Sequence, residues 1–226
     1  MKKWPAGLVV LTAVILTFAG GLVLASCGDN DNPTTTMGGP TTSEQTTSSL
    51  PPTTTTLGQI LPGVDAVRYD NEEFGFTIGR PASSPVETSG FEAYLPLTQK
   101  PVVGFALTPE LFQGTNLIDA GVYIGAISDP AVAEKWDQPA ADSGEESAGT
   151  AEINGVSFAV FTSTGAAAGN IYDQKVYRTL RDGTCFEIVE LLHSGNIGNY
   201  EEGTIVEFDK ATFQGYLEAM VQTFSF

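Results

Sequence analysis

The sequence is short of basic residues. It holds ten Lys and Arg against 27 Asp and Glu, which gives a formal net charge of -17 at pH 7. Nucleic-acid binding depends on clustered Lys and Arg that displace counterions from phosphates, so this composition argues against a DNA or RNA partner. It also argues against docking on anionic lipid through charge. Such acidity is typical of a self-repelling, soluble surface and identifies no partner by itself.

Histidine and cysteine are scarcer still, with His193 alone and only Cys27 and Cys185. One histidine leaves a serine nucleophile little choice of base, and the chain has no Gly-x-Ser-x-Gly elbow. A zinc site would lack most of its usual ligands. A Cys185–His193 pair fails on geometry, because eight residues of one expected strand separate them by about 26 Å. We therefore expect no catalytic residue and no cofactor, with Cys185 a buried hydrophobe and His193 a polar strand end.

Long apolar runs are also rare, and the clearest one lies near the N-terminus. Lys2 and Lys3 precede residues 8–24, which carry no charge, and this pattern is typical of a secretory signal. An uncleaved membrane helix is the alternative, since residues 7–25 approach the roughly 20 apolar residues that a span needs. The segment Leu24-Ala25-Ser26-Cys27 favours cleavage. It resembles the bacterial lipobox, whose cysteine receives diacylglycerol before signal peptidase II cuts in front of it.

This resemblance implies a lipoprotein. Residues 1–26 would be the signal peptide, and Cys27 would be the site of lipid attachment and hence the contact with the membrane. Each buried methylene contributes about 0.8 kcal/mol, so the two or three acyl chains of that family hold firmly. The expected location is the extracytoplasmic face of the cell membrane. Cys185 would then have no cysteine left to pair with, which excludes an intrachain disulfide.

A tether is expected over residues 27–62. Of the 24 residues from Pro33 to Thr56, 18 are Thr, Ser or Pro, and Glu44 is the only charged one. A segment with so little apolar surface cannot offset the entropy of folding, so we predict that it is disordered. A plain spacer is the first interpretation, and an O-glycosylated stalk is the alternative.

The folded domain is expected over residues 63–226, enough for one packed core. Asn154-Gly155 and Asp182-Gly183 separate apolar runs and supply the positive φ angles of two-residue hairpins, which predicts a largely antiparallel sheet. Several of the runs are apolar on both alternating faces, so the sheet should be covered on both sides. The expected strands are 74–78, 91–95, 102–107, 120–127, 156–162 and 185–192.

Helices are expected at three places. The strongest follows Asp209, because Phe213, Leu217, Met220, Val221 and Phe224 fall on one helical face, and this face should pack into the core. A short helix should run from Asp129-Pro130 to Trp136. Thr108-Pro109 gives a similar start. The run Gly165-Ala-Ala-Ala-Gly169 lacks the Lys of a phosphate-binding loop and is interpreted as a flexible loop.

Residues 68–81, which read RYDNEEFGFTIGRP, resemble the opening strand pair of the Mog1/PsbP-like superfamily. Residues 216–226, YLEAMVQTFSF, resemble the closing helix of bacterial PsbP-like lipoproteins, and residues 154–158 and 196–200 fit the same group. The resemblance implies an α+β fold in which a largely antiparallel sheet is sandwiched by helices, with the C-terminal helix in the core. The tryptophan that often follows the entry proline is missing after Pro81. No binding residue of the family maps onto this chain.

Acidic residues remain as candidates for binding. Asp142, Glu145 and Glu146, with Glu201 and Glu202 later, could offer oxygens to calcium, yet no spaced ligand ladder supports more than a weak site, so solvated loops are expected. The sequence thus predicts a non-catalytic binding or assembly-accessory module of unknown ligand, displayed outside the membrane. The alternative is a carboxylate-dependent hydrolase acting on cell-envelope polymers, although the sequence selects no carboxylate pair for it.

Overall fold

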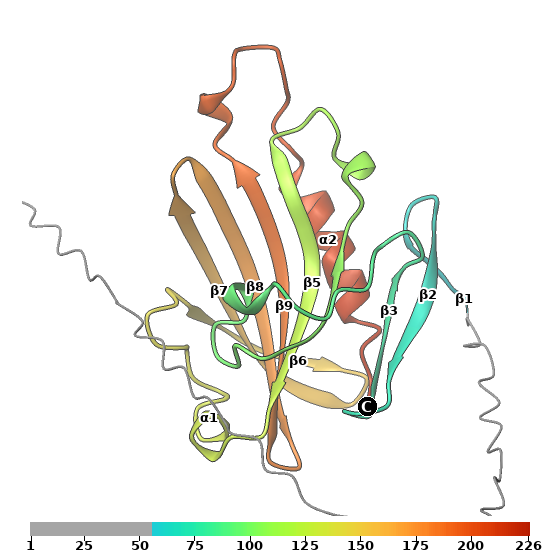
Figure 1. Ribbon diagram of the computed structural model, residues 1–226, viewed down its shortest axis with the longest axis vertical. Coiled ribbons are helices and arrows are strands. Elements are labelled where there is room, and N and C mark those ends of the chain that lie inside the picture. Colours follow the sequence, from blue (N-terminus) through green and yellow to red (C-terminus); the bar gives the residue numbers. More distant parts are fainter. Residues whose placement is uncertain (1–55) are drawn as a thin grey trace, which may run out of the picture. The chain divides into compact units, whose positions relative to one another are not determined.

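The computed structural model describes residues 56–226, with side chains from Ile60 onward, and within this part the chain forms two antiparallel sheets and one long helix (Figure 1). The smaller sheet has the order β1-β2-β3, and the larger one has the order β4-β5-β9-β8-β7-β6. Every neighbouring pair in both sheets is antiparallel. The protein therefore has a β-rich α+β fold, as the hairpin signals predict.

The strands of the smaller sheet are β1 (Thr56–Leu61), β2 (Val64–Asn71) and β3 (Phe76–Pro81). Those of the larger sheet are β4 (Pro101–Ala106), β5 (Leu117–Ile127), β6 (Glu146–Ile153), β7 (Val156–Ala167), β8 (Asn170–Arg181) and β9 (Thr184–Gly195). The helices are α1 (Pro130–Ala133) and α2 (Lys210–Val221), with short 3-10 turns η1 (Glu92–Tyr94), η2 (Pro109–Leu111) and η3 (Ile197–Asn199).

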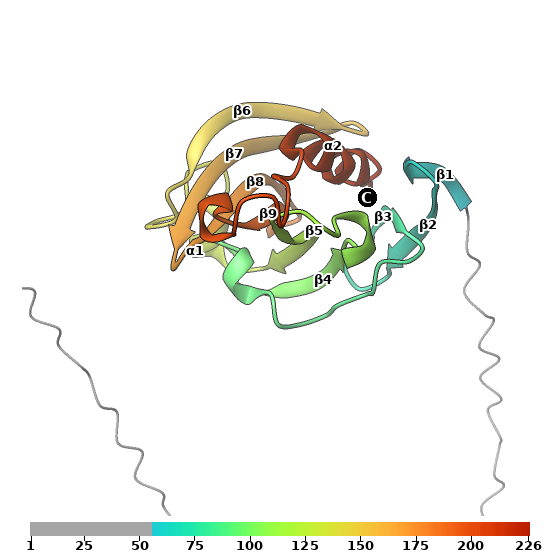
Figure 2. The ribbon, with the colours of Figure 1, turned by 90° about the horizontal axis from the view of Figure 1, so that it is seen from above.

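Helix α2 packs on one face of the larger sheet. Seen from above, the sheet curves around this helix, and the smaller sheet lies beside it (Figure 2). Asp209 begins the helix, because its carboxylate accepts hydrogen bonds from the backbone N–H and the hydroxyl of Thr212. Leu217 and Met220 on the inward face are fully buried. The expected C-terminal core helix is confirmed.

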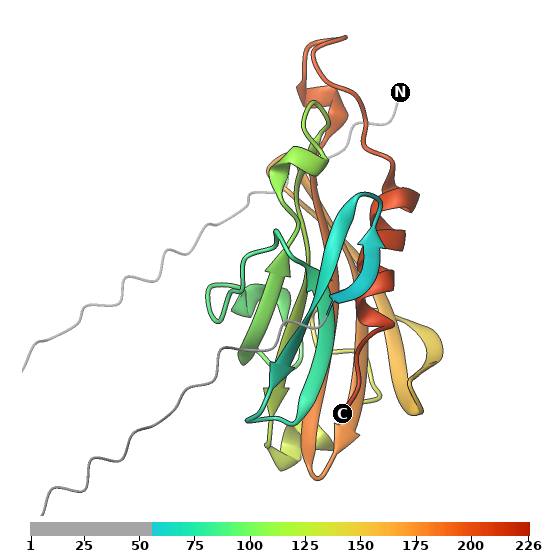
Figure 3. The ribbon, with the colours of Figure 1, turned by 90° about the vertical axis from the view of Figure 1, so that its right-hand side faces the viewer.

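The residues after α2 tie the helix to the smaller sheet. Ser225 exchanges two backbone hydrogen bonds with Thr77 of β3, at 2.7 and 3.0 Å. Phe224 stacks on Phe76 at a centroid distance of 5.3 Å and meets Phe158 of β7 edge to face. Figure 3 shows β2 and β3 alongside α2 in this arrangement. One main core thus joins the helix, the smaller sheet and the concave face of the larger sheet.

The opposite face of the larger sheet is covered mainly by irregular segments. Phe91 and Leu95 pack there against Tyr123, and Trp136 joins the same cluster. The prediction of a strand at 91–95 was wrong: the two buried residues are four apart and flank the 3-10 turn η1, so the spacing is that of a turn and not of a strand. The helix expected from Asp129 to Trp136 is one turn, α1, although Asp129 caps it as predicted.

The hairpins confirm the turn signals and add one. Asn154 and Gly155 have φ angles of 48° and 79°, and Asp182 and Gly183 have 50° and 77°, as two-residue hairpins require. The expected flexible loop at 165–169 was wrong. Residues up to Ala167 belong to β7, and Ala168 and Gly169, at φ 50° and 84°, form a third hairpin into β8.

The folded part begins earlier than the sequence indicated. The prediction placed its start at Gly63, but β1 runs from Thr56 to Leu61 and pairs with β2, so the last residues of the expected tether belong to the smaller sheet. Leu61 is buried. The sequence did not indicate this, because Leu61 closely follows the Thr-rich residues of the expected tether. The predicted signal peptide and the rest of the tether lie outside the described residues. Among residues 56–226, no helix is long and apolar enough to cross a membrane.

Candidate functional site

The residues with reactive side chains that the sequence drew attention to are separated in the structure. Cys27, the expected lipid attachment site, lies outside the described residues. Cys185 and His193 lie on the same strand, β9, eight positions apart. Cys185 is fully buried, and burial raises the pKa of its thiol to about 12, so it stays protonated and unreactive.

His193 contacts residues next to the third hairpin. Its ring stacks on Tyr172 at a centroid distance of 4.3 Å, and its Nε2 lies 3.1 Å from the side-chain oxygen of Asn170. Burial lowers the pKa of the imidazole, which keeps it neutral near pH 7. These contacts hold the start of β8 against the end of β9, as expected for a polar residue at a strand end.

The acidic residues of 142–146 do not form one solvated loop as expected. Glu146 is exposed, but the side chain of Glu145 is fully buried and forms an ion pair with Arg178. Glu201 and Glu202 are exposed. Within residues 56–226 no three His, Cys, Asp or Glu side chains gather closely enough to hold a metal ion, so the weak calcium site gains no support there.

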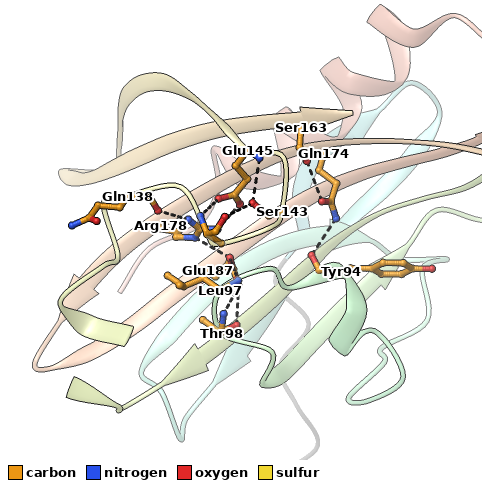
Figure 4. A network of polar contacts seen from close by, with 11 residues as sticks. Tyr94, Leu97, Thr98, Gln138, Ser143, Glu145, Ser163, Gln174, Arg178 and Glu187 are labelled. Carbon is orange, nitrogen blue, oxygen red and sulfur yellow. Dashed lines mark hydrogen bonds and ion pairs between the residues drawn. The ribbon is translucent and has the colours of Figure 1, made fainter. Parts of the chain in front are cut away.

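Arg178 lies at the centre of a buried cluster of charges (Figure 4). The cluster is on the face of the larger sheet that the irregular segments cover. Its guanidinium donates to Glu145 and to Oε1 of Glu187, the latter at 2.8 Å. Glu187 also accepts from the backbone N–H and the hydroxyl of Thr98, both at 2.9 Å, and the N–H of Ala140 donates to Glu145 at 2.7 Å. A buried charge is tolerable when it is paired and fully hydrogen-bonded, and here both carboxylates are.

The partners of the Arg178 cluster show that it has a structural role. Arg178 and Glu187 stand on β8 and β9, whereas Thr98 and Glu145 belong to the segments that cover them. The cluster therefore fastens both covering segments to the sheet. Nearby, the amide of Gln174 donates to the backbone oxygen of Tyr94 and extends the same fastening (Figure 4).

A pocket lies on the other face, beside the first half of α2. We call it the α2 pocket. Its lining residues come from β7, β8, β9 and α2, and its volume is about 230 Å³. The lining consists of Thr162, Ser163, Thr164, Asp173, Gln174, Lys175, Glu190, Leu192, Lys210, Gln214 and Leu217.

The sequence of β7 explains why the sheet is open at this point. Its inward-facing side chains pass from buried Phe158 and Val160 to exposed Thr162 and Thr164. Helix α2 makes most of its contacts with β9, β5 and the smaller sheet. The ends of β7 and β8 toward the third hairpin therefore carry polar residues where the rest of the concave face is apolar.

Glu190 is the most buried ionisable group in the α2 pocket. Its side chain is 3% exposed, and its Oε1 accepts a hydrogen bond of 2.9 Å from the hydroxyl of Tyr177. Its Oε2 is buried and has no hydrogen-bond partner among the described residues. A buried polar atom without a partner costs about 1–3 kcal/mol, and more when it is charged. Burial raises the pKa of Glu190 to about 7, so protonated and ionised forms coexist near neutral pH.

Two lysines share this pocket with two carboxylates. Lys210, at the start of α2, forms an ion pair of 2.8 Å with Asp173 of β8, which also accepts from the hydroxyl of Thr164 at 2.7 Å. Lys175 lies directly opposite Glu190 in the β8–β9 register, and its Nζ is 3.4 Å from Glu218 on α2. The α2 pocket therefore offers acceptors and cations side by side.

Two other hollows among the described residues have no buried ionisable side chain in their lining. A shallow one of about 520 Å³ lies around Trp136, Leu180 and Phe226 at the other end of the sheet. Another, of about 330 Å³, is lined by the exposed loop that contains Glu201 and Glu202. Neither therefore combines a buried charge with an apolar lining, so the α2 pocket is the better candidate site.

Sequence reasoning missed both polar clusters, although one signal was present. Glu187 and Glu190 interrupt the apolar run of β9, and Arg178 interrupts that of β8. Charged residues within strands that are otherwise apolar on both faces need buried partners. Those partners, Tyr177 and Glu145 among them, could only be identified once the strand register and the path of the covering segments were known.

Comparison with known proteins adds little to this description. No family model matches the chain, and no curated protein matches it. A solved structure of a protein from Bacteroides thetaiotaomicron, determined at 1.50 Å resolution, is similar over 70% of this chain with 10% sequence identity and a TM-score of 0.37. The chain spans about half of that protein's length, 47%. A likeness at this level supports no argument about function.

Proposed function

We propose that the chain is a lipoprotein anchored by Cys27 to the extracytoplasmic face of the cell membrane. Its folded domain works there as a non-catalytic binding or assembly-accessory module of the Mog1/PsbP-like kind, with the sheet sandwiched between α2 and the segments on its other face. The lipobox-like residues 24–27 support the anchor. The antiparallel sheet and the closing helix α2 agree with the domain type that the sequence motifs suggest.

The α2 pocket is the observation that favours a binding role. Glu190 presents an acceptor atom without a partner at the pocket, next to Lys175 and within a lining that also holds Asp173 and Lys210. Ligand sites combine an apolar floor with a few convergent polar groups, and here Leu192 and Leu217 supply the apolar part. A bound ligand that donates to Glu190 would relieve the cost of the unpartnered oxygen.

The hydrolase alternative would use the same pocket, because Glu190 with a pKa near 7 has the acidity of a general acid. Its second carboxylate would be Asp173. Two facts favour binding. Asp173 is already engaged by Lys210 and Thr164, and a space of about 230 Å³ is small for a polymer segment with two carboxylates flanking its scissile bond.

Native mass spectrometry of the full lipoprotein, extracted in detergent from its own membrane, tests this proposal. A small compound should co-purify with the wild-type protein and with a Thr150→Trp control on the exposed strand β6. It should be lost from Thr164→Trp, whose indole would fill the α2 pocket. Equal occupancy in both variants would contradict a role for the pocket. Cleavage of envelope polymers that disappears in Glu190→Gln would favour the hydrolase instead.

A further inference from the structure

The α2 pocket gathers an unusual share of the protein's positive charge. Only eight Lys and Arg follow Cys27 in the sequence, and two of them, Lys175 and Lys210, line this one pocket. They approach from different elements, β8 and α2, that lie 35 positions apart in the chain. Lys210 is paired with Asp173 and Lys175 with Glu218, but an ammonium group has three donors, so both lysines can also donate to a negatively charged group in the pocket.

The same pocket disfavours a plain anion. Glu190 and Asp173 also line it. When the carboxyl group of Glu190 is ionised, its unpartnered Oε2 can accept a hydrogen bond but cannot donate one. A phosphate or acetate ion would be repelled by these carboxylates. A simple cation would in turn be repelled by Lys175 and Lys210. A ligand with both signs of charge has a partner in the pocket for each of its groups.

Spacing narrows the ligand further. Lys175 and Glu190 are direct cross-strand partners, so their side chains leave neighbouring positions on the same face of the sheet. Their charges are therefore close together, as are the ammonium and carboxylate groups of an α-amino acid. The volume of about 230 Å³ lies below the roughly 300–1,000 Å³ of drug-sized sites, and Leu192 and Leu217 offer a small apolar surface.

We propose that the α2 pocket binds a small zwitterion of the α-amino acid class. The ammonium group donates to Oε2 of Glu190, the carboxylate meets Lys175 and Lys210, and a short side chain contacts Leu192 and Leu217. This inference rests on the proposed binding function and specifies its ligand.

Titration calorimetry on the full lipoprotein in detergent, at about pH 8, tests the ligand class with L-alanine as the probe. L-alanine should bind. N-acetyl-L-alanine lacks the ammonium group and L-alanine methyl ester lacks the carboxylate, so each should bind about tenfold more weakly or worse. Glu190→Gln should weaken L-alanine binding by a similar factor, because an amide offers a poorer acceptor to an ammonium group. Glu152→Gln, on the exposed strand β6, is the matched control and should bind as the wild type does.

Thr164→Trp protects the test against a folding defect in Glu190→Gln, because Thr164 is exposed and its replacement should abolish binding while the fold persists. The inference is overturned if L-alanine gives no heat, if both blocked analogues bind as well as L-alanine, or if Glu152→Gln weakens binding as much as Glu190→Gln. If the extracted lipoprotein carries a pocket-dependent compound of other chemistry, the binding function stands and the zwitterion fails. If it carries no compound and binds no probe, both fail.

Discussion

At Glu190, burial and its neighbours act on one carboxyl group in opposite directions. Burial raises the pKa to about 7, Lys175 and the hydroxyl of Tyr177 on β8 lower it, and Glu218 on α2 raises it. The β5 neighbour in the register, Val122, contributes no charge. Burial and the nearby carboxylate also raise the pKa of Tyr177, so the phenol keeps its proton and remains the donor.

This balance predicts a pH dependence of stability. An ordinary Glu titrates near 4.5, below the folded-state value of about 7, so the folded state binds more protons between these two pH values. The contribution of Glu190 to the free energy of unfolding is therefore fully present below about pH 4.5 and is lost as the pH rises through about 7. The total loss is about 3 kcal/mol at most. Urea midpoints of wild type and Glu190→Gln, measured from pH 4.5 to 8, should diverge with rising pH in favour of the variant. Parallel profiles would contradict the raised pKa.

Arg178 offers the second test at this scale. Arg178→Met should lower the free energy of unfolding by about 3–5 kcal/mol, because it leaves Glu145 and Glu187 buried without their cation. Arg68→Met is the matched control. Its ion pair with Asp70 is about half exposed, and such pairs contribute about 0–1 kcal/mol. Chemical denaturation measures both, and similar losses for the two variants would show that the buried cluster adds no special stability.

At the scale of elements, helix α2 carries the apolar face that the sequence predicted. Leu217→Ala should cost about 2–5 kcal/mol, since Leu217 is fully buried and its removal leaves a cavity between α2 and the sheet. Ala211→Gly, at an exposed position in the first turn of the same helix, should cost at most about 1 kcal/mol through helix propensity alone. Urea midpoints of the two variants measure both losses of stability. A loss of less than 1 kcal/mol for Leu217→Ala would mean that α2 is not a core layer.

Local signals explain which elements the sequence could predict. The hairpins at Asn154-Gly155 and Asp182-Gly183 depend on residues that accept positive φ angles, and Asp209 caps α2 through its own first turn. The hairpin at Ala168-Gly169 was missed because alanine rarely adopts the left-handed region. In each case that succeeded, the information lay within a few residues of the chain.

The candidate site could not be predicted in this way, because its residues meet only through the register and the placement of α2. Lys175 and Glu190 become neighbours through the pairing of β8 with β9. Lys210 contacts Asp173 of β8 only because the start of α2 lies over that strand. Neither spacing forms a motif. The sequence did show a glutamate inside an apolar strand. Burying such a charge costs free energy unless another part of the chain supplies a hydrogen-bond partner.

At the scale of the whole molecule, the proposed anchor and the folded domain divide the work between them. The described part begins at β1 and carries the α2 pocket, whereas Cys27 stands 29 positions before Thr56 in the sequence. The lining of the α2 pocket, as far as the structure describes it, comes from β7, β8, β9 and α2. Loss of the lipid should therefore change where the protein is found and leave ligand binding intact.

Cys27→Ala tests this division. The thiol of Cys27 is the acylation site that the lipobox-like motif offers, so the variant should lose its acyl mass and its cleavage by signal peptidase II, while the melting temperature of the folded domain stays unchanged within error. Ser26→Ala is the matched control, because a small residue before the cysteine suits the motif and processing should continue. Intact-mass measurement and membrane fractionation report both properties. A Cys27→Ala protein that is still cut after Ser26 and still carries acyl chains would refute the proposed anchor, whereas a lower melting temperature would show that the N-terminal segment supports the fold.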